Sequence, residues 1–165
     1  MAAAADYCGF RFLDELLALP DNQPDWELTW SRFIAEIDAS IYVIDCLPNM
    51  NAEQVAARTE PLVRQLRKAR PRTPIVLVED RLYSNAPLVE GNRKRNESSR
   101  QALWTAYRKL VEAGVPGMHY LPGDRLLDAD GEGTVDNSHP TDLGFAQHAD
   151  AFAKVLGPLL PKAMA

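Results

Sequence analysis

Three short apolar runs, separated by stretches with helical spacing, constrain the fold more than any other feature. They are SIYVID (40–45), TPIVLVED (73–80) and the shorter GMHYLPG (117–123). The middle run is apolar almost throughout until Glu79, which is typical of a strand buried on both faces of a parallel sheet. Residues 40–157 thus alternate strand and helix, and this order predicts right-handed βαβ units in an α/β fold with helices covering the sheet.

The first helix between these runs has clear signals at its start. Asn51 is expected to be its N-cap, and Gln54 stands three residues later, as in a capping box. The apolar spacing continues to about Arg70. Pro61 lies inside this stretch and predicts a kink or a break, because proline removes one backbone hydrogen bond of a helix.

The other two helices are placed by their apolar spacing and their ends. One is expected over 97–114, ending at Gly114, after a long loop over 81–96 that has no clear period. The last should begin near Thr141. The residues predicted to face the core are Leu103, Trp104, Tyr107, Leu110 and Val111 on the first of these helices and Ala146, Ala149, Phe152, Ala153 and Leu156 on the second.

Length and composition indicate one domain over residues 1–165 with an ordinary hydrophobic core. The net charge of −5 argues against a nucleic-acid partner, which rewards a basic face. No apolar run approaches the roughly 18–20 residues of a membrane span. The first ten residues lack the basic and apolar regions of a signal peptide, so the cytoplasm is the default compartment, although a secreted origin stays open. Cys8 and Cys46 form no metal-type cluster, and neither metal nor cofactor is expected.

Ligands of open α/β sheets bind beyond the carboxyl ends of the strands. That rule selects the segments 45–49, 79–85 and 123–139, where polar residues gather.

Asp136 and His139 are the first candidates in these segments. A carboxylate three residues before a histidine can reach Nδ1 across a tight turn, and it would then orient the ring as a general base. The alternative is that Asp136 or Ser138 only caps the following helix. Asn49 likewise has two interpretations, as an amide donor to a developing oxyanion or as an ordinary turn residue.

The segment after the second strand offers a further set of polar side chains. Glu79, Asp80, Arg81 and Asn85 are candidates for a substrate-contacting loop. Internal pairing is the favoured interpretation for the three charged residues. His148, on the last helix, is expected to be solvated.

Taken in order, YVIDCLPNM, PIVLVEDRLYSNA and DNSHPTDLGFAQHADAF resemble the second half of the SGNH hydrolases, also called the GDSL lipase/esterase superfamily. The resemblance covers about residues 34–160. It implies a three-layer α/β/α sandwich of the flavodoxin-like kind and hydrolysis of acyl esters without a metal. By position, His139 would be the general base, Asp136 its orienting acid and Asn49 an oxyanion donor.

The family's nucleophile block, a serine after the first strand, has no counterpart here. We therefore expect residues 1–33 to be an atypical N-terminal segment: either the family's first strand and its serine are missing, or the chain has diverged there. Ser31 lies in a predicted helix, Ser40 stands at a strand start, and Cys8 precedes a glycine. None of the three has the setting of a nucleophile, which stays unassigned.

Two classes of function follow from these observations. The first is an ester hydrolase that acts on acetylated carbohydrate or another small acyl ester by a Ser-His-Asp mechanism. The second is a catalytically inactive or truncated binding module of the same fold, which could form a homo-oligomer through an exposed sheet edge. A nucleotide binder is disfavoured, because no glycine-rich phosphate loop follows any strand.

Overall fold

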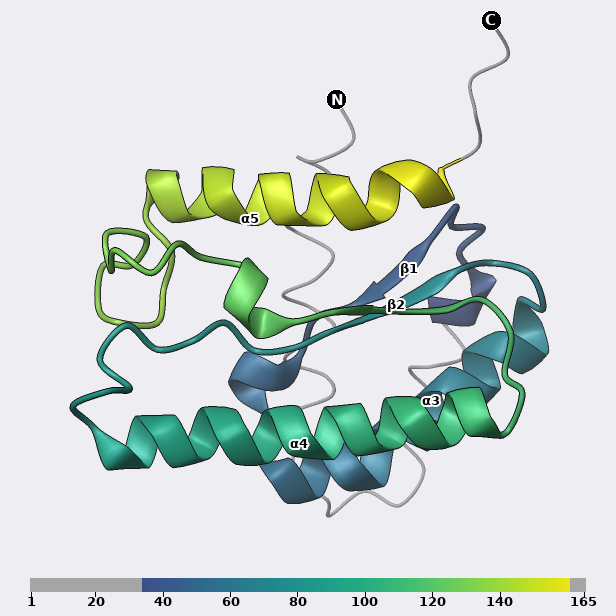
Figure 1. Ribbon diagram of the computed structural model, residues 1–165. Coiled ribbons are helices and arrows are strands. Elements are labelled where there is room, and N and C mark those ends of the chain that lie inside the picture. Colours follow the sequence, from purple (N-terminus) through teal and green to yellow (C-terminus); the bar gives the residue numbers. More distant parts are fainter. Residues whose placement is uncertain (1–33, 161–165) are drawn as a thin grey trace, which may run out of the picture.

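The computed structural model describes residues 34–160, which form a parallel sheet between two layers of helices (Figure 1). The strands are β1 (Tyr42–Ile44), β2 (Ile75–Val78) and β3 (Met118–Leu121). They pair in parallel in the order β1-β2-β3, with Val43 opposite Val76 and Val76 opposite His119. The three strands lie within the runs predicted for them, and the α/β class is confirmed.

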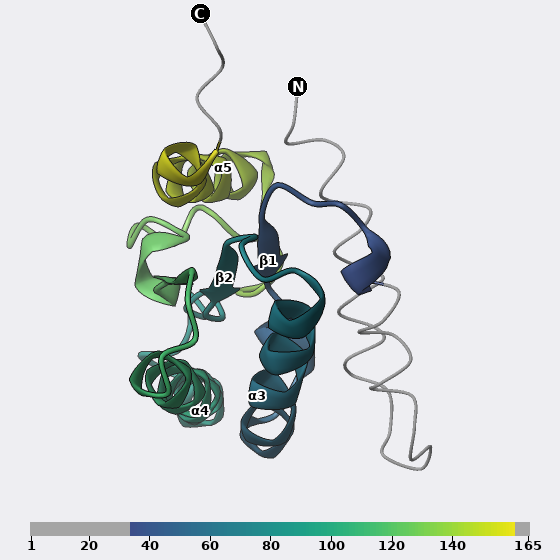
Figure 2. The ribbon, with the colours of Figure 1, turned by 90° about the vertical axis from the view of Figure 1, so that its right-hand side faces the viewer.

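The helices lie on both faces of the sheet. Helices α3 (Ala52–Ala69) and α4 (Glu90–Glu112) cover one face, and α5 (Asp142–Leu156) covers the other, as Figure 2 shows. The three-layer α/β/α arrangement is therefore confirmed. Three short 3-10 turns complete the elements: η1 (Leu47–Asn49), η2 (Gly123–Arg125) and η3 (Gly157–Leu159).

The central strand β2 is the core of the sheet, since all four of its side chains are buried. Ile75 and Leu77 pack toward α3 and α4, while Val76 and Val78 pack toward α5. This alternation follows from the period of two along a strand, and it explains why the run is apolar on both faces. Within residues 34–160, no helix combines the length and the apolar composition that crossing a bilayer requires.

Helix α3 begins as predicted and continues where a break was expected. Asn51 accepts a hydrogen bond from Gln54 N at 2.9 Å, and Asn51 N donates to Gln54 Oε1 at 3.0 Å, so the capping box is present. The helix runs unbroken through Pro61 to Ala69. Its buried face includes Val55 before the proline and Leu66 after it, so the helix packs against the core on both sides of Pro61 and is stabilised across it.

Helix α4 begins at Glu90, so the long loop predicted over 81–96 ends earlier than expected. Its first turns carry exposed ion pairs between residues four apart, Lys94 with Glu90 and Arg93 with Glu97. Such pairs stabilise a helical surface without leaving an apolar period in the sequence, which explains the late predicted start.

The inward faces of the last two helices differ from the prediction. Trp104 and Val111 are exposed, and the buried face of α4 instead contains Ala106 between Leu103 and Leu110. On α5, Thr141 is the N-cap as expected, but the residues turned outward include the three alanines predicted to be buried, Ala146, Ala149 and Ala153. Alanine favours helices at any position, so it marks the core face poorly.

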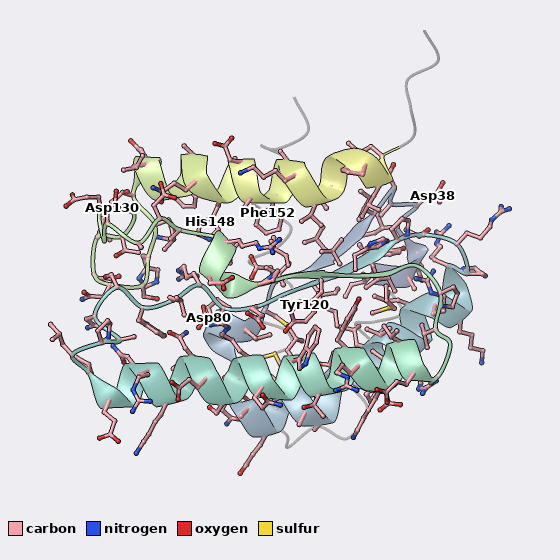
Figure 3. The ribbon with its side chains drawn as sticks, in the orientation of Figure 1. Asp38, Asp80, Tyr120, Asp130, His148 and Phe152 are labelled. Carbon is pink, nitrogen blue, oxygen red and sulfur yellow. The ribbon has the colours of Figure 1, made fainter. Side chains whose placement is uncertain are left out.

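His148 was predicted to be solvated, and this is wrong. It is half-buried, its Nδ1 lies 2.9 Å from Gly144 O, and its ring stacks on Phe152 at 6.5 Å between centroids. Figure 3 shows both rings on the side of α5 that faces the sheet. Burial is the main cause that lowers the pKa of His148, so the neutral ring is favoured there.

Truncation of the central strand should be costly. We expect Leu77→Ala to lower the free energy of unfolding by about 2–5 kcal/mol, because it leaves a cavity among fully buried neighbours. Val111→Ala, on the exposed side of α4, should change it by less than about 0.5 kcal/mol. Urea unfolding of both variants measures the difference, and equal losses would contradict the placement of β2 in the core.

Candidate active site

The segment between β3 and α5 presents residues 136–138 at the tip of a small hairpin. Thr134 pairs with Pro140 in an antiparallel bridge, and Thr141 N donates to Gly133 O at 3.0 Å. Val135 N donates to His139 O at 2.9 Å, which closes the turn. Asn137 has φ of 76°, a left-handed conformation that asparagine tolerates better than most residues.

Asp136 joins both ends of this turn. Its Oδ2 lies 2.7 Å from His139 Nδ1, while Oδ1 accepts from His139 N at 2.8 Å and from Ser138 N at 3.0 Å. Helix capping falls to Thr141, whose Oγ1 accepts from Gly144 N at 3.1 Å. The structure therefore brings Asp136 and His139 together in the pair geometry, while another residue caps α5.

The electrostatics of this pair suit a base. The hydrogen bonds from His139 and Ser138 hold the pKa of Asp136 down at about 2, so its carboxylate is ionised at neutral pH. An ionised carboxylate only accepts, and we therefore assign the ring proton to Nδ1 and the lone pair to Nε2. The side chain of His139 is 68% exposed. Among residues 34–160 no hydrogen bond to Nε2 is formed.

Asn49 ends the 3-10 turn η1 that follows β1, and its side chain is exposed. It therefore lies after the carboxyl end of a strand, as the hairpin does, because the three strands are parallel. No hydrogen bond links Asn49 to the Asp136–His139 pair in the described residues. Its role as an oxyanion donor stays a prediction.

Glu79 is buried and fully engaged within the protein. Its carboxylate accepts from Arg100 Nε at 2.6 Å, from Tyr120 Oη at 2.7 Å and from Gly123 N at 2.8 Å. Burial, followed by the bond to Glu79, raises the pKa of Tyr120 above its usual range. The internal pairing that the sequence favoured is present at Glu79, which ties the ends of β2 and β3 to α4.

Asp80 and Arg81 continue this network toward the hairpin. Asp80 Oδ2 accepts from Asn96 Nδ2 at 3.1 Å, and Figure 3 shows Asp80 on the α4 side of the sheet. Burial raises the pKa of Asp80 to about 6 and that of Asp45, at the end of β1, to about 7, against the opposing charge of Arg81. The guanidinium of Arg81 donates to Ser138 O and Ser138 Oγ.

Asn85, the last candidate of this loop, builds the start of α4. Its carbonyl accepts from Leu88 N and Val89 N, and its side-chain Oδ1 accepts from Asn92 Nδ2 at 2.7 Å. A substrate contact at Asn85 stays a prediction.

Two polar residues of this region, Ser138 and Asn96, escaped the sequence reasoning. Ser138 was considered only as a cap, and its contact with Arg81 crosses 57 positions of the chain. Asn96 is buried although it stands in the charged run NRKRN. The sequence could have indicated its burial only through its position in the first turns of α4, and that helix was predicted to start later than it does.

Of the three sequence candidates for the nucleophile, only Ser40 lies within the described residues, and it is not brought to His139. Ser40 precedes β1 and is exposed, at the amino end of the sheet, as predicted. Ser31 and Cys8 lie outside the described residues. Nearer the hairpin, Ser84 Oγ donates to Asn137 Oδ1 at 3.1 Å and contacts Thr134 Oγ1. Over residues 34–160, no hydroxyl is bonded to the His139 ring, and no group of three or more potential metal-ligating side chains gathers.

Comparison with known proteins gives a consistent result. The sequence profile of the GDSL-like lipase/acylhydrolase family matches residues 25–157. A solved structure described as a GDSL-like lipase from Bacteroides ovatus is 27% identical, with a TM-score of 0.75, and the match covers 79% of this chain and 39% of that one. None of the curated protein sequences matches the chain significantly.

Two more distant structures share the fold. The salicylyl-acyltransferase SsfX3 from a tetracycline biosynthetic pathway is 19% identical with a TM-score of 0.65, over 79% of this chain and 40% of that one. A family 3 carbohydrate esterase of Clostridium thermocellum is 13% identical with a TM-score of 0.59, over 82% and 65%. The chain thus spans about two fifths of the length of the first two structures.

The close approach of the hairpin to α5 is testable at Gly144. A Cβ at Gly144 would lie 2.0 Å from Gly133 O, so Gly144→Ala must push the hairpin away. We expect a loss of about 1–3 kcal/mol in the free energy of unfolding. Gly91→Ala, in the first turns of α4, meets open space and should stabilise by up to about 1 kcal/mol. Thermal unfolding of both variants measures these changes. If both substitutions stabilise the protein, the close packing of the hairpin against Gly144 is contradicted.

Proposed function

The chain belongs to the GDSL-like lipase/acylhydrolase family, and from this premise we propose that it hydrolyses acyl esters with His139 as general base and Asp136 as the acid that orients it. The observation that carries the proposal is the 2.7 Å contact between Asp136 Oδ2 and His139 Nδ1 in an exposed turn beyond the carboxyl end of the sheet. This edge is where open α/β folds bind ligands.

The chemistry is acyl transfer in two steps. Nε2 of His139 takes the proton of a serine hydroxyl as its oxygen bonds to the ester carbonyl carbon, and the imidazolium then gives that proton to the departing alcohol. Water next attacks the acyl-enzyme, loses a proton to His139, and releases the carboxylic acid with the serine restored. Asn49 would donate its amide to the oxyanion in both steps. The serine itself stays unassigned.

For the substrate, we propose an acetylated carbohydrate or another small acyl ester. A carbohydrate esterase is among the structures that share this fold.

The second candidate function is a non-catalytic binding module of the same fold. The observation that favours it is the lack of any hydroxyl bonded to His139 among residues 34–160. Without an activated nucleophile, oxyanion donors and substrate binding leave only a small residual rate.

Labelling with a fluorophosphonate separates the two candidates. We expect the purified chain to form one adduct on a serine, which mass spectrometry maps, and we expect His139→Ala to abolish it. His119→Ala, on β3, serves as the matched control and should label normally. If neither an adduct nor turnover of p-nitrophenyl acetate is found, the hydrolase proposal fails for this chain and the binding module remains.

Asp136→Asn tests the orienting acid separately from the fold. Asparagine can still accept the two backbone N–H groups through its oxygen, so the turn should persist. Its amide would face Nδ1 as a donor and move the ring proton to Nε2, which then cannot accept a proton from serine. We expect kcat for p-nitrophenyl acetate to fall by about 10²–10⁴-fold with little change in KM. A kcat within about twofold of the parent protein would contradict the role of Asp136.

A further inference from the structure

The geometry points to Arg81 as a positioning residue for the Asp136–His139 pair: we propose that its guanidinium clamps Ser138 and thereby fixes the turn against the end of β2. The purpose of this clamp rests on the proposed function, but its existence is tested without turnover.

The clamp is formed by two donors on one residue. Arg81 Nε donates to the backbone carbonyl of Ser138, and Arg81 Nη2 donates to Ser138 Oγ at 3.1 Å. Ser138 stands between the two members of the pair, and its own N–H donates to Asp136 Oδ1 at 3.0 Å. One guanidinium therefore fixes the residue that precedes His139 and donates to Asp136.

Arg81 is itself held in place by Asp80 and by Asn96 of α4. Its side chain is only 13% exposed, and its Nη1 lies 3.9 Å from Oδ1 of Asp80, whose side chain is 3% exposed. Asn96 of α4 donates to Asp80 Oδ2 at 3.1 Å and to Arg81 O at 3.0 Å, and it accepts from Tyr83 N at 2.9 Å. A buried amide of α4 thus fixes both residues that precede the loop.

The other ties of the hairpin to this loop are exposed. Ser84 N donates to Asn137 O at 3.1 Å, and Ser84 Oγ donates to Asn137 Oδ1 at 3.1 Å. Hydrogen bonds from a charged donor are about twice as strong as those between neutral groups, and water competes less for them when they are shielded. Arg81 is therefore the main restraint between the end of β2 and the turn.

The clamp requires the shape of arginine as well as its charge. A planar guanidinium presents Nε and Nη2 at a fixed spacing, which matches Ser138 O and Ser138 Oγ. Lysine carries the same charge on a single, more flexible nitrogen and cannot reproduce the fork. Arg81→Lys keeps a positive charge beside Asp80 while it removes the bidentate contact.

The test measures the tautomer of His139 directly. Nitrogen-15 labelling of histidine and two-bond ¹H–¹⁵N correlation spectra at pH 8 report which ring nitrogen carries the proton. We expect Nδ1–H in the parent protein, and in Arg81→Lys a ratio of Nδ1–H to Nε2–H that is lower by about tenfold, as one charge-assisted hydrogen bond allows. The unfolding temperature of Arg81→Lys is measured as well, so that the spectra compare folded proteins.

Arg70→Lys is the matched control. Arg70 donates to the carbonyls of Ala35 and Glu36 and pairs with Asp38, so it loses the same kind of contact. Figure 3 shows Asp38 at the end of the molecule opposite Asp130, which lies in the segment that leads to the hairpin. We expect the His139 tautomer to be unchanged in Arg70→Lys.

The outcomes separate this proposal from the proposed function. An unchanged tautomer in both Arg81→Lys and Arg81→Gln would overturn the clamp, and so would an Nε2–H ring in the parent protein. A shifted tautomer in Arg81→Lys supports the clamp even if the chain never reacts with a fluorophosphonate. If the chain does hydrolyse p-nitrophenyl acetate, Arg81→Lys should lower kcat by about tenfold and leave KM within about twofold.

Discussion

The structure depends on how three charged residues are satisfied at the end of a fully buried strand. Burying an unpaired charge is costly, so Glu79, Asp80 and Arg81 must each find a partner where β2 leaves the core. They do so in different directions: Glu79 toward α4 and the end of β3, Asp80 toward Asn96, and Arg81 toward the hairpin at Ser138. The end of β2 is therefore the junction that fixes the surrounding loops relative to the sheet.

The features predictable from sequence are those with a local cause. The strand run 73–80 is apolar because both faces of β2 are covered, and the capping box at Asn51 needs only two residues three positions apart. The contact between Asp136 and His139 has the same character, because a single tight turn carries both residues. Their spacing suggested the pair, although only the structure separates it from a helix cap at Thr141.

The features that escaped prediction depend on contacts distant in sequence or on ambiguous residues. The first turns of α4 are stabilised by surface ion pairs and by a buried Asn96, and neither leaves an apolar period. The alanines of α5 marked the wrong face, because alanine suits a helix whether buried or exposed. The bond between Arg81 and Ser138 joins residues 57 positions apart, and no short pattern encodes it.

An acid–base pair of this kind must satisfy two opposing requirements. His139 must be exposed to meet a substrate, yet an exposed hydrogen bond contributes little to holding its own geometry, because water competes for both partners. The turn must therefore be held in place by backbone hydrogen bonds and by side chains at the end of β2. Asp136 accepts hydrogen bonds from the backbone N–H groups of Ser138 and His139. The shielded Arg81 in turn donates to Ser138. The shielded Arg81 and the buried Asp80 at the end of β2 thus keep the turn rigid, while His139 stays exposed at the surface where it can react.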